Sequence, residues 1–238
     1  LAFFTVGIFS CSTNDMETEE PMSSTAYLNE NSSDIDLSEI TCNEDAEINK
    51  SKKISNGNFN GKILTINSGN VTLENVQNIV IVISEDAVGC INIKNCSEII
   101  IITIEGADEL KVADSEVKEI DVKEDNSSVV LVDGTKVEKI NVSEKGTSIQ
   151  SESSKDSEST PVISELNVAP TVDNVDVSGG TIGNVVINEA GAESAPTVTV
   201  TGGITIEKVE SKDETGATKP GNIVVSDNAK DDVILPED

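Results

Sequence analysis

From residue 61 onward the chain alternates between short apolar runs and polar turns. Most apolar residues in these runs are valine or isoleucine, and many lie at every second position. Both features are typical of β-strands. Since no stretch has a persuasive apolar stripe at helical spacing, the pattern predicts almost no helix.

One six-residue cassette recurs, with the order apolar, two polar, apolar, one variable, apolar. It begins at Val76, Cys96, Val117 and Val137, with later copies at Val172 and Ile182. The steps between the first four copies differ by no more than one position. Each repeat also has room for a second strand, for example residues 79–83 followed by 90–94. A fixed period of about 20 residues predicts a solenoid.

We therefore predict an all-β fold, a parallel β-helix or β-solenoid of about seven or eight coils over residues 61–235. A leucine-rich-repeat solenoid, which shares the period, is the alternative. Polar inserts at 149–161, 188–196 and 210–221 should form loops. The glycine pairs 179–180 and 202–203 should form tight corners with positive φ.

The charges support stacked coils. In a solenoid, side chains one period apart lie about 4.8 Å from each other. Opposite charges at that distance attract, and like charges repel. Four pairs of opposite charge occur at an offset of one period: Glu74/Lys94, Glu116/Lys136, Lys118/Glu138 and Glu119/Lys139.

In period and strand pattern, residues 61–235 resemble the right-handed parallel β-helix family, which includes pectin lyases and many bacterial surface proteins. The resemblance is architectural and implies the fold alone.

The amino-terminal residues predict where in the cell the protein is located. Residues 1–10 form an apolar run too short to span a bilayer, typical of the h-region of a signal peptide, here without its start. Residues 8–11 (IFSC) resemble a bacterial lipobox, which implies that Cys11 is lipidated and that the protein is exported and anchored in the envelope, at the outer membrane or cell surface. An ordinary signal peptide is the alternative. We expect residues 11–40 to form a flexible acidic tether and residues 41–60 to form a cap or first coil.

Composition narrows the chemistry. The net charge of −28 disfavours binding to nucleic acid. The chain has no histidine, arginine or tryptophan, and no aromatic residue follows Phe59. Most common catalytic constellations, phosphate clamps and aromatic sugar platforms are therefore excluded.

Once Cys11 is lipidated, three cysteines remain and allow at most one internal disulfide. Cys96 aligns with Val76 and Val117, which predicts a core position.

Two candidate sites emerge. Asp173 and Asp176 flank Asn174 and, with the more distant Asp121, offer oxygen ligands for calcium, although outward solvated charge between inward valines is the favoured interpretation. In the runs 79–83 and 99–104, alternation points Val80, Val82, Ile100 and Ile102 outward as an apolar patch. Such a patch needs a cover, which could be residues 35–60, a partner or a second copy. The alternative is that the register assigned to these strands is wrong.

These observations predict a non-catalytic, lipid-anchored envelope protein whose solenoid serves as a rigid spacer or as a binding and adhesion surface for a protein or glycan partner. The alternative function is a carbohydrate-active β-helix enzyme, a polysaccharide lyase or hydrolase that uses aspartates and calcium.

Overall fold

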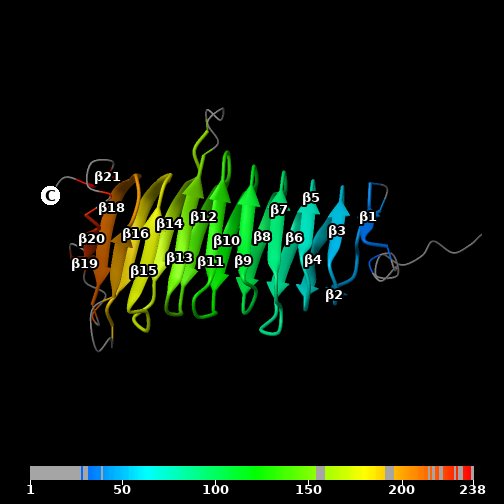
Figure 1. Ribbon diagram of the computed structural model, residues 1–238, viewed down its shortest axis with the longest axis horizontal. Coiled ribbons are helices and arrows are strands. Elements are labelled where there is room, and N and C mark those ends of the chain that lie inside the picture. The colour runs from blue at the N-terminus through cyan, green and yellow to red at the C-terminus, as the bar shows by residue number, and fades with distance from the viewer. Residues whose placement is uncertain are drawn as a thin grey trace, which may run out of the picture.

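The chain winds into a β-solenoid of about eight turns (Figure 1). The computed structural model describes residues 28, 32–38, 40–153, 159–190, 196–213, 215, 218–219, 222–227, 229 and 233–236. Residues 1–27, which include Cys11 and most of the predicted tether, lie outside this set. The predicted all-β solenoid is confirmed. The leucine-rich-repeat alternative is wrong, because the second half of each described repeat is a strand.

Two sheets form the walls of the solenoid. The first sheet has ten strands: β1 (Asp34–Asp36), β3 (Lys52–Ser55), β5 (Val71–Glu74), β7 (Cys90–Lys94), β9 (Glu109–Ala113), β11 (Ser128–Val132), β13 (Thr147–Glu152), β15 (Asn174–Ser178), β17 (Thr197–Val200) and β20 (Ile223–Val225). Each strand pairs in parallel with the equivalent strand of the next turn.

The second sheet has eleven strands. Its main path runs through β2 (Ala46–Ile48), β4 (Asn58–Ile66), β6 (Gln77–Ile83), β8 (Ser97–Ile104), β10 (Glu116–Val122), β12 (Lys136–Val142), β14 (Val162–Val168), β16 (Thr181–Asn188) and β18 (Ile204–Lys212). Two short strands pair with β18: β19 (Thr218–Lys219), which is antiparallel, and β21 (Val233–Ile234), which is parallel.

The core lies between the two sheets. Along β6, Ile79, Ile81 and Ile83 are fully buried, while Val80 and Val82 between them are only partly buried. The same alternation recurs from strand to strand, so each turn places aliphatic side chains on those of the turn before. Phe59 is the largest of the fully buried side chains.

The solenoid begins earlier than the sequence indicated. β1 already pairs with β3, within residues assigned to the tether, and Ile35, Leu37, Ile48 and Ile54 are buried in the core. The idea that residues 35–60 cover the outward patch is therefore wrong. These residues form the first turns, because their apolar positions alternate as in the later strands.

The repeat period is confirmed, but one alignment of cassettes is wrong. Ile79 pairs with Ile99, and Ile99 pairs with Val117, so the second step is two positions shorter than the first. The register shifts between Ile79 and Val80, where β8 carries one more residue than β6. The run IIIITI begins with four consecutive isoleucines, none of which marks its frame, and the shift was therefore missed. The copy at Val172 also belongs to the other sheet, since Val175 lies in β15.

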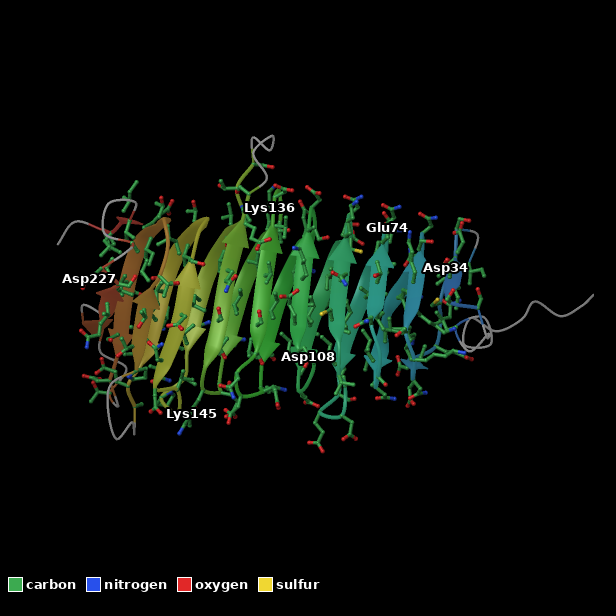
Figure 2. All side chains as sticks on the ribbon, viewed as in Figure 1. Asp34, Glu74, Asp108, Lys136, Lys145 and Asp227 are labelled. Atoms are coloured by element: carbon green, nitrogen blue, oxygen red, sulfur yellow. The ribbon has the colours of Figure 1, made fainter. Side chains whose placement is uncertain are left out.

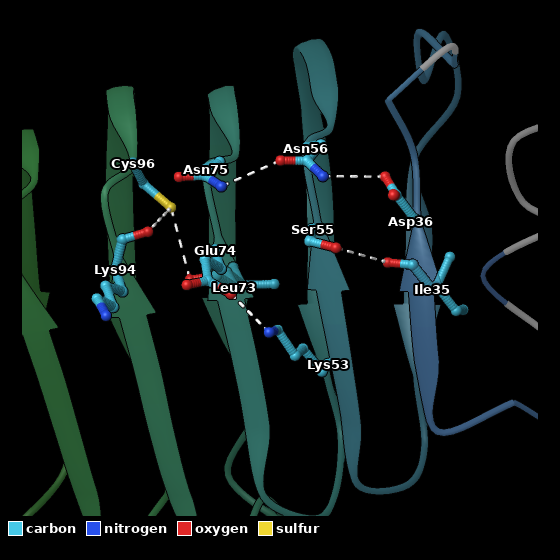
Figure 3. Close-up of polar contacts among 10 residues, drawn as sticks. All are labelled: Ile35, Asp36, Lys53, Ser55, Asn56, Leu73, Glu74, Asn75, Lys94 and Cys96. Atoms are coloured by element: carbon cyan, nitrogen blue, oxygen red, sulfur yellow. Dashed lines mark hydrogen bonds and ion pairs between the residues drawn. The ribbon is translucent and has the colours of Figure 1, made fainter.

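One corner of the solenoid uses left-handed backbone at successive turns (Figure 3). Asn56, Asn75 and Asn95 have φ of 59°, 54° and 51°. Asparagine tolerates this conformation better than other residues with a Cβ. Its side chain also connects the turns: Asn75 Nδ2 donates to Asn56 Oδ1 at 3.0 Å, and Asn56 Nδ2 donates to Asp36 Oδ1 at 3.1 Å.

The glycine pairs differ. Gly179 and Gly180 have φ of 71° and 68°, as predicted. A Cβ at Gly179 would lie 2.0 Å from the carbonyl oxygen of Ser151, so glycine is required there. Gly202 and Gly203 do not have positive φ, so the prediction is wrong for that pair.

The predicted charge pairs follow the register. Glu74 lies opposite Lys94, Glu116 opposite Lys136, and Glu119 opposite Lys139. Their contacts are modest: Lys136 Nζ is 3.8 Å from Glu116 Oε1, and both side chains are about 70% exposed. Glu74 makes its ion pair with Lys53 instead, at 2.6 Å, and this hydrogen bond lowers the pKa of Glu74. Exposed pairs of this kind contribute at most about 1 kcal/mol and serve mainly to set register.

We predict that Asn75→Ala destabilises the solenoid more than Asn75→Gly. Both substitutions remove the hydrogen bond to Asn56, but alanine also adopts left-handed φ at a cost of about 1–2 kcal/mol. Urea unfolding followed by circular dichroism measures the difference. If glycine were as destabilising as alanine, the corner would depend on the amide bond and not on the backbone conformation.

Candidate functional site

An aliphatic cluster occupies the outer face of the second sheet, on β4, β6 and β8 in the amino-terminal half of the rod (Figure 1). Its members point away from the core and remain at least partly exposed. We call it the apolar patch: Ile63, Val80, Val82, Ile100 and Ile101. Ile63 is the most exposed of them, at 38%.

The structure changes the membership that the sequence predicted. Val80, Val82 and Ile100 are partly exposed on the outer face as expected, but Ile102 is completely buried and Ile101 takes its place. The register shift after Ile79 is the cause, because it pairs Val80 with Ile101 and Ile81 with Ile102. Ile63 was missed, although Leu64 and Ile66 alternate with it and could have indicated its direction.

Within the patch the side chains form rows across the strands. Ile63 lies opposite Val80, and Val80 opposite Ile101. A parallel row runs from Thr65 through Val82 to Thr103, which is only 8% exposed. Ile100 leans toward the preceding turns, since its Cδ1 lies 3.8 Å from the position of a Cβ on Gly61. The patch is therefore a continuous surface three strands wide.

Acidic residues border the patch on both sides. On β2 Glu47 lies opposite Thr65, and just before that strand Asp45 accepts the backbone N–H of Ile63 at 2.9 Å. On β10 Asp121 lies opposite Thr103. Glu119, two residues earlier on the same face, continues the row of Ile101.

On β10, β12 and β14 the equivalent outer positions are polar. Asn141 Nδ2 donates to Asp121 Oδ1 at 2.7 Å and to Glu119 Oε1 at 2.6 Å. Asn167 continues the network by donating to Asn141 Oδ1 at 3.0 Å. The outer face thus changes from aliphatic to a hydrogen-bonded amide and carboxylate row within one strand spacing.

An outward valine elsewhere shows how the chain covers such a residue. Val130 on β11 faces outward from the first sheet, yet it is only 4% exposed. Lys111 on β9 reaches across β11 to Glu152 on β13, with Nζ 3.3 Å from Oε2. The aliphatic stem of a lysine can cover apolar surface in this way while its ammonium stays in water. No ion pair crosses the apolar patch among the described residues.

The carboxylates suggested for calcium have separate partners. Asp173 Oδ2 lies 3.6 Å from Lys145 Nζ, and Asp176 Oδ1 accepts from Asn174 Nδ2 at 2.7 Å. Thr199 Oγ1 in turn donates to Asn174 Oδ1 at 2.6 Å. Asp121 belongs to the other sheet, so it does not join them. No group of three or more potential metal ligands occurs among the described residues.

Charged side chains line the two rims of the rod. Figure 2 shows them along both rims, with Glu74 and Lys136 at one rim and Asp108 and Lys145 at the other. The described residues include no helix long and apolar enough to cross a membrane.

The three described cysteines form no disulfide. Cys96 is buried at the corner shown in Figure 3, where its Sγ contacts the carbonyl oxygen of Lys94 at 3.3 Å, and its burial raises the pKa of the thiol. The core position predicted for Cys96 is confirmed. Its equivalent in the next turn is Ser115, whose Oγ accepts from the Cys96 backbone N–H at 2.9 Å, and not Val117.

Comparison with known proteins finds no matching family model, no similar curated protein and no similar solved structure.

We predict that millimolar calcium chloride leaves the melting temperature equal to that in the same concentration of magnesium chloride. Asp173 and Asp176 already have different protein partners, and no third carboxylate approaches them among the described residues. If calcium bound a specific site, a calcium concentration of one hundred times its Kd would add about 2.7 kcal/mol to the free energy of unfolding and raise Tm by several degrees. A calcium-specific rise that Asp176→Asn abolishes would contradict this.

We predict that a Cys11→Ser variant of the folded chain has one rapidly alkylated thiol. Cys90 lies on the outer face of β7 and is partly exposed, whereas Cys42 and Cys96 are buried. Mass spectrometry after brief iodoacetamide treatment should find the label on Cys90 alone, and urea should expose the other two. Labelling of Cys96 at the rate of Cys90 would show that the corner opens readily.

Proposed function

We propose that this protein is a lipid-anchored bacterial envelope protein whose solenoid is a non-catalytic binding surface held on a rigid rod. The observation that carries the binding role is the apolar patch, a group of aliphatic side chains on the outer face of the second sheet with acidic residues at its border. Contiguous exposed apolar surface on a soluble domain usually marks an interaction site.

The scaffold suits such a role. Parallel strands that pair turn upon turn hold the patch residues at fixed spacings on three adjacent strands. The residues of the patch lie in strands and not in loops. Their backbone is therefore already ordered, and little conformational entropy is lost when a partner binds. A long rod also holds its outer face away from the membrane to which an anchor would attach it.

The enzymatic alternative has less support. Histidine and arginine, the basic residues on which pectin-degrading enzymes depend, are absent from the whole sequence. Asp121 lies in the second sheet and Asp176 in the first, so these candidate carboxylates do not converge. A binding role requires no such convergence.

Anchoring rests on Cys11 and its resemblance to a lipobox. A diacylated or triacylated cysteine holds a chain at a membrane lastingly, because each buried CH₂ adds about 0.8 kcal/mol. The surplus of acidic residues keeps the outer surface soluble and repels anionic headgroups, so contact with the bilayer would be confined to the anchor.

Metabolic labelling tests the anchor. We expect the chain, expressed in a diderm bacterium behind a short basic leader, to incorporate radiolabelled palmitate and to fractionate with membranes. Cys11→Ser should abolish both properties, whereas Cys90→Ser should change neither. Absence of label on the wild-type chain, with the protein exported, would show that it is not a lipoprotein.

A further inference from the structure

The border of the apolar patch gives the surface a recognisable charge pattern. Five carboxylates surround it among the described residues: Asp45, Glu47, Glu98, Glu119 and Asp121. Three lysines lie near the same border: Lys62, Lys118 and Lys139, which is opposite Glu119. The surface is therefore an aliphatic centre with a net negative border.

This pattern disfavours several occupants. Two copies of the chain placed face to face would bring one acidic border onto another, in molecules whose net charge is already −28. An anionic membrane would be repelled for the same reason. Glycan surfaces are commonly bound by stacking on aromatic rings, and the patch has none, because Phe59 is buried and no ring follows it.

The width of the patch matches a helix whose axis runs along the strands. The bordering strands β2 and β10 are four strand spacings apart, which is about 19 Å at roughly 4.8 Å per strand. An α-helix is about 10–12 Å across with its side chains. The aliphatic rows on β4, β6 and β8 would lie beneath the helix, and lysines or arginines on its two flanks would extend to Glu47 on one side and to Glu119 and Asp121 on the other.

From these observations we infer that the apolar patch binds a basic amphipathic helix of a partner protein, whose aliphatic stripe lies on Ile63, Val80 and Ile101 and whose flanking cations pair with the acidic border. The inference rests on the proposed binding function and adds the class of partner. Helices commonly cover the faces of sheets in single domains, and here the cover would come from another chain. Apolar contact would supply most of the affinity, and charge would supply orientation and association rate.

Synthetic helices test this with the purified full chain. The probe is a fluorescein-labelled peptide of about 18 residues, or five turns, with leucines at helical spacing on one face and lysines on both flanks. One control peptide replaces the lysines with glutamates, and another keeps the composition but scrambles the leucines off the common face. Fluorescence anisotropy in physiological salt should show binding of the first peptide and at least about tenfold weaker binding of both controls.

Matched variants locate the site. Ile63→Thr, Val80→Thr and Ile101→Thr together keep the β-branched shape and should weaken binding of the lysine peptide by about tenfold or more. Val162→Thr is the control, because Val162 is also an exposed valine on the second sheet, three strands beyond β8. It should leave the Kd unchanged within about twofold. If the triple variant does not fold, as judged by circular dichroism, Glu47→Gln with Glu119→Gln tests the border, with Glu138→Gln as control.

Several results would overturn the inference. One is that the scrambled peptide binds as tightly as the lysine peptide. Another is that the triple variant binds the lysine peptide as tightly as the wild type does. A third is that light scattering shows a dimer for the wild type but a monomer for the triple variant. The last result would assign the patch to a second copy. The assay uses no lipid, so its failure leaves the Cys11 anchor intact, and failure of palmitate labelling leaves the helix-binding inference intact.

Discussion

Parallel stacking of nearly equal turns is the constraint on which the rest of this structure depends. Each strand obtains its hydrogen bonds from the turns before and after it, so each side chain has its nearest cross-strand neighbour about one period away in sequence. The side chain at each position must therefore be compatible with the equivalent side chains of the turns before and after it. Isoleucines stack on isoleucines inside, asparagines stack at the corner, and opposite charges alternate outside.

This constraint explains what could be predicted. The period and the two strands per repeat are local patterns, and from them the sequence indicates the solenoid, the exact extent of β7 and the opposition of Glu116 to Lys136. It also explains the errors. The step from Ile99 to Val117 is two positions shorter than the steps around it, and a run of isoleucines hides that change. Only pairing across the sheet shows which isoleucine faces the core.

The same limitation applies to the candidate site. Val80 and Val82 could be assigned outward because polar Asn78 and Ser84 bracket a clean alternation around them. Ile102 could not be separated from Ile101 without the register, and β1 is too short, with one apolar residue between two aspartates, to be distinguished from a tether. The acidic border also depends on stacking, because Glu47 and Asp121 are far apart in the chain and meet the patch only through it.

The sheet edges at the two ends of the rod are poorly suited to binding partners, which leaves the outer faces of the sheets for that role. Exposed sheet edges invite pairing with other strands, and short, charged edge strands oppose it. At the amino-terminal end, β1 and β2 have three residues each, and their outward side chains are Asp34, Asp36 and Glu47. At the other end β20 has three residues, and β18 is already paired with β19 and β21. Since short strands limit pairing at both ends, and acidic side chains add to this at the first, recognition is left to the outer faces, where aliphatic side chains collect on β4, β6 and β8.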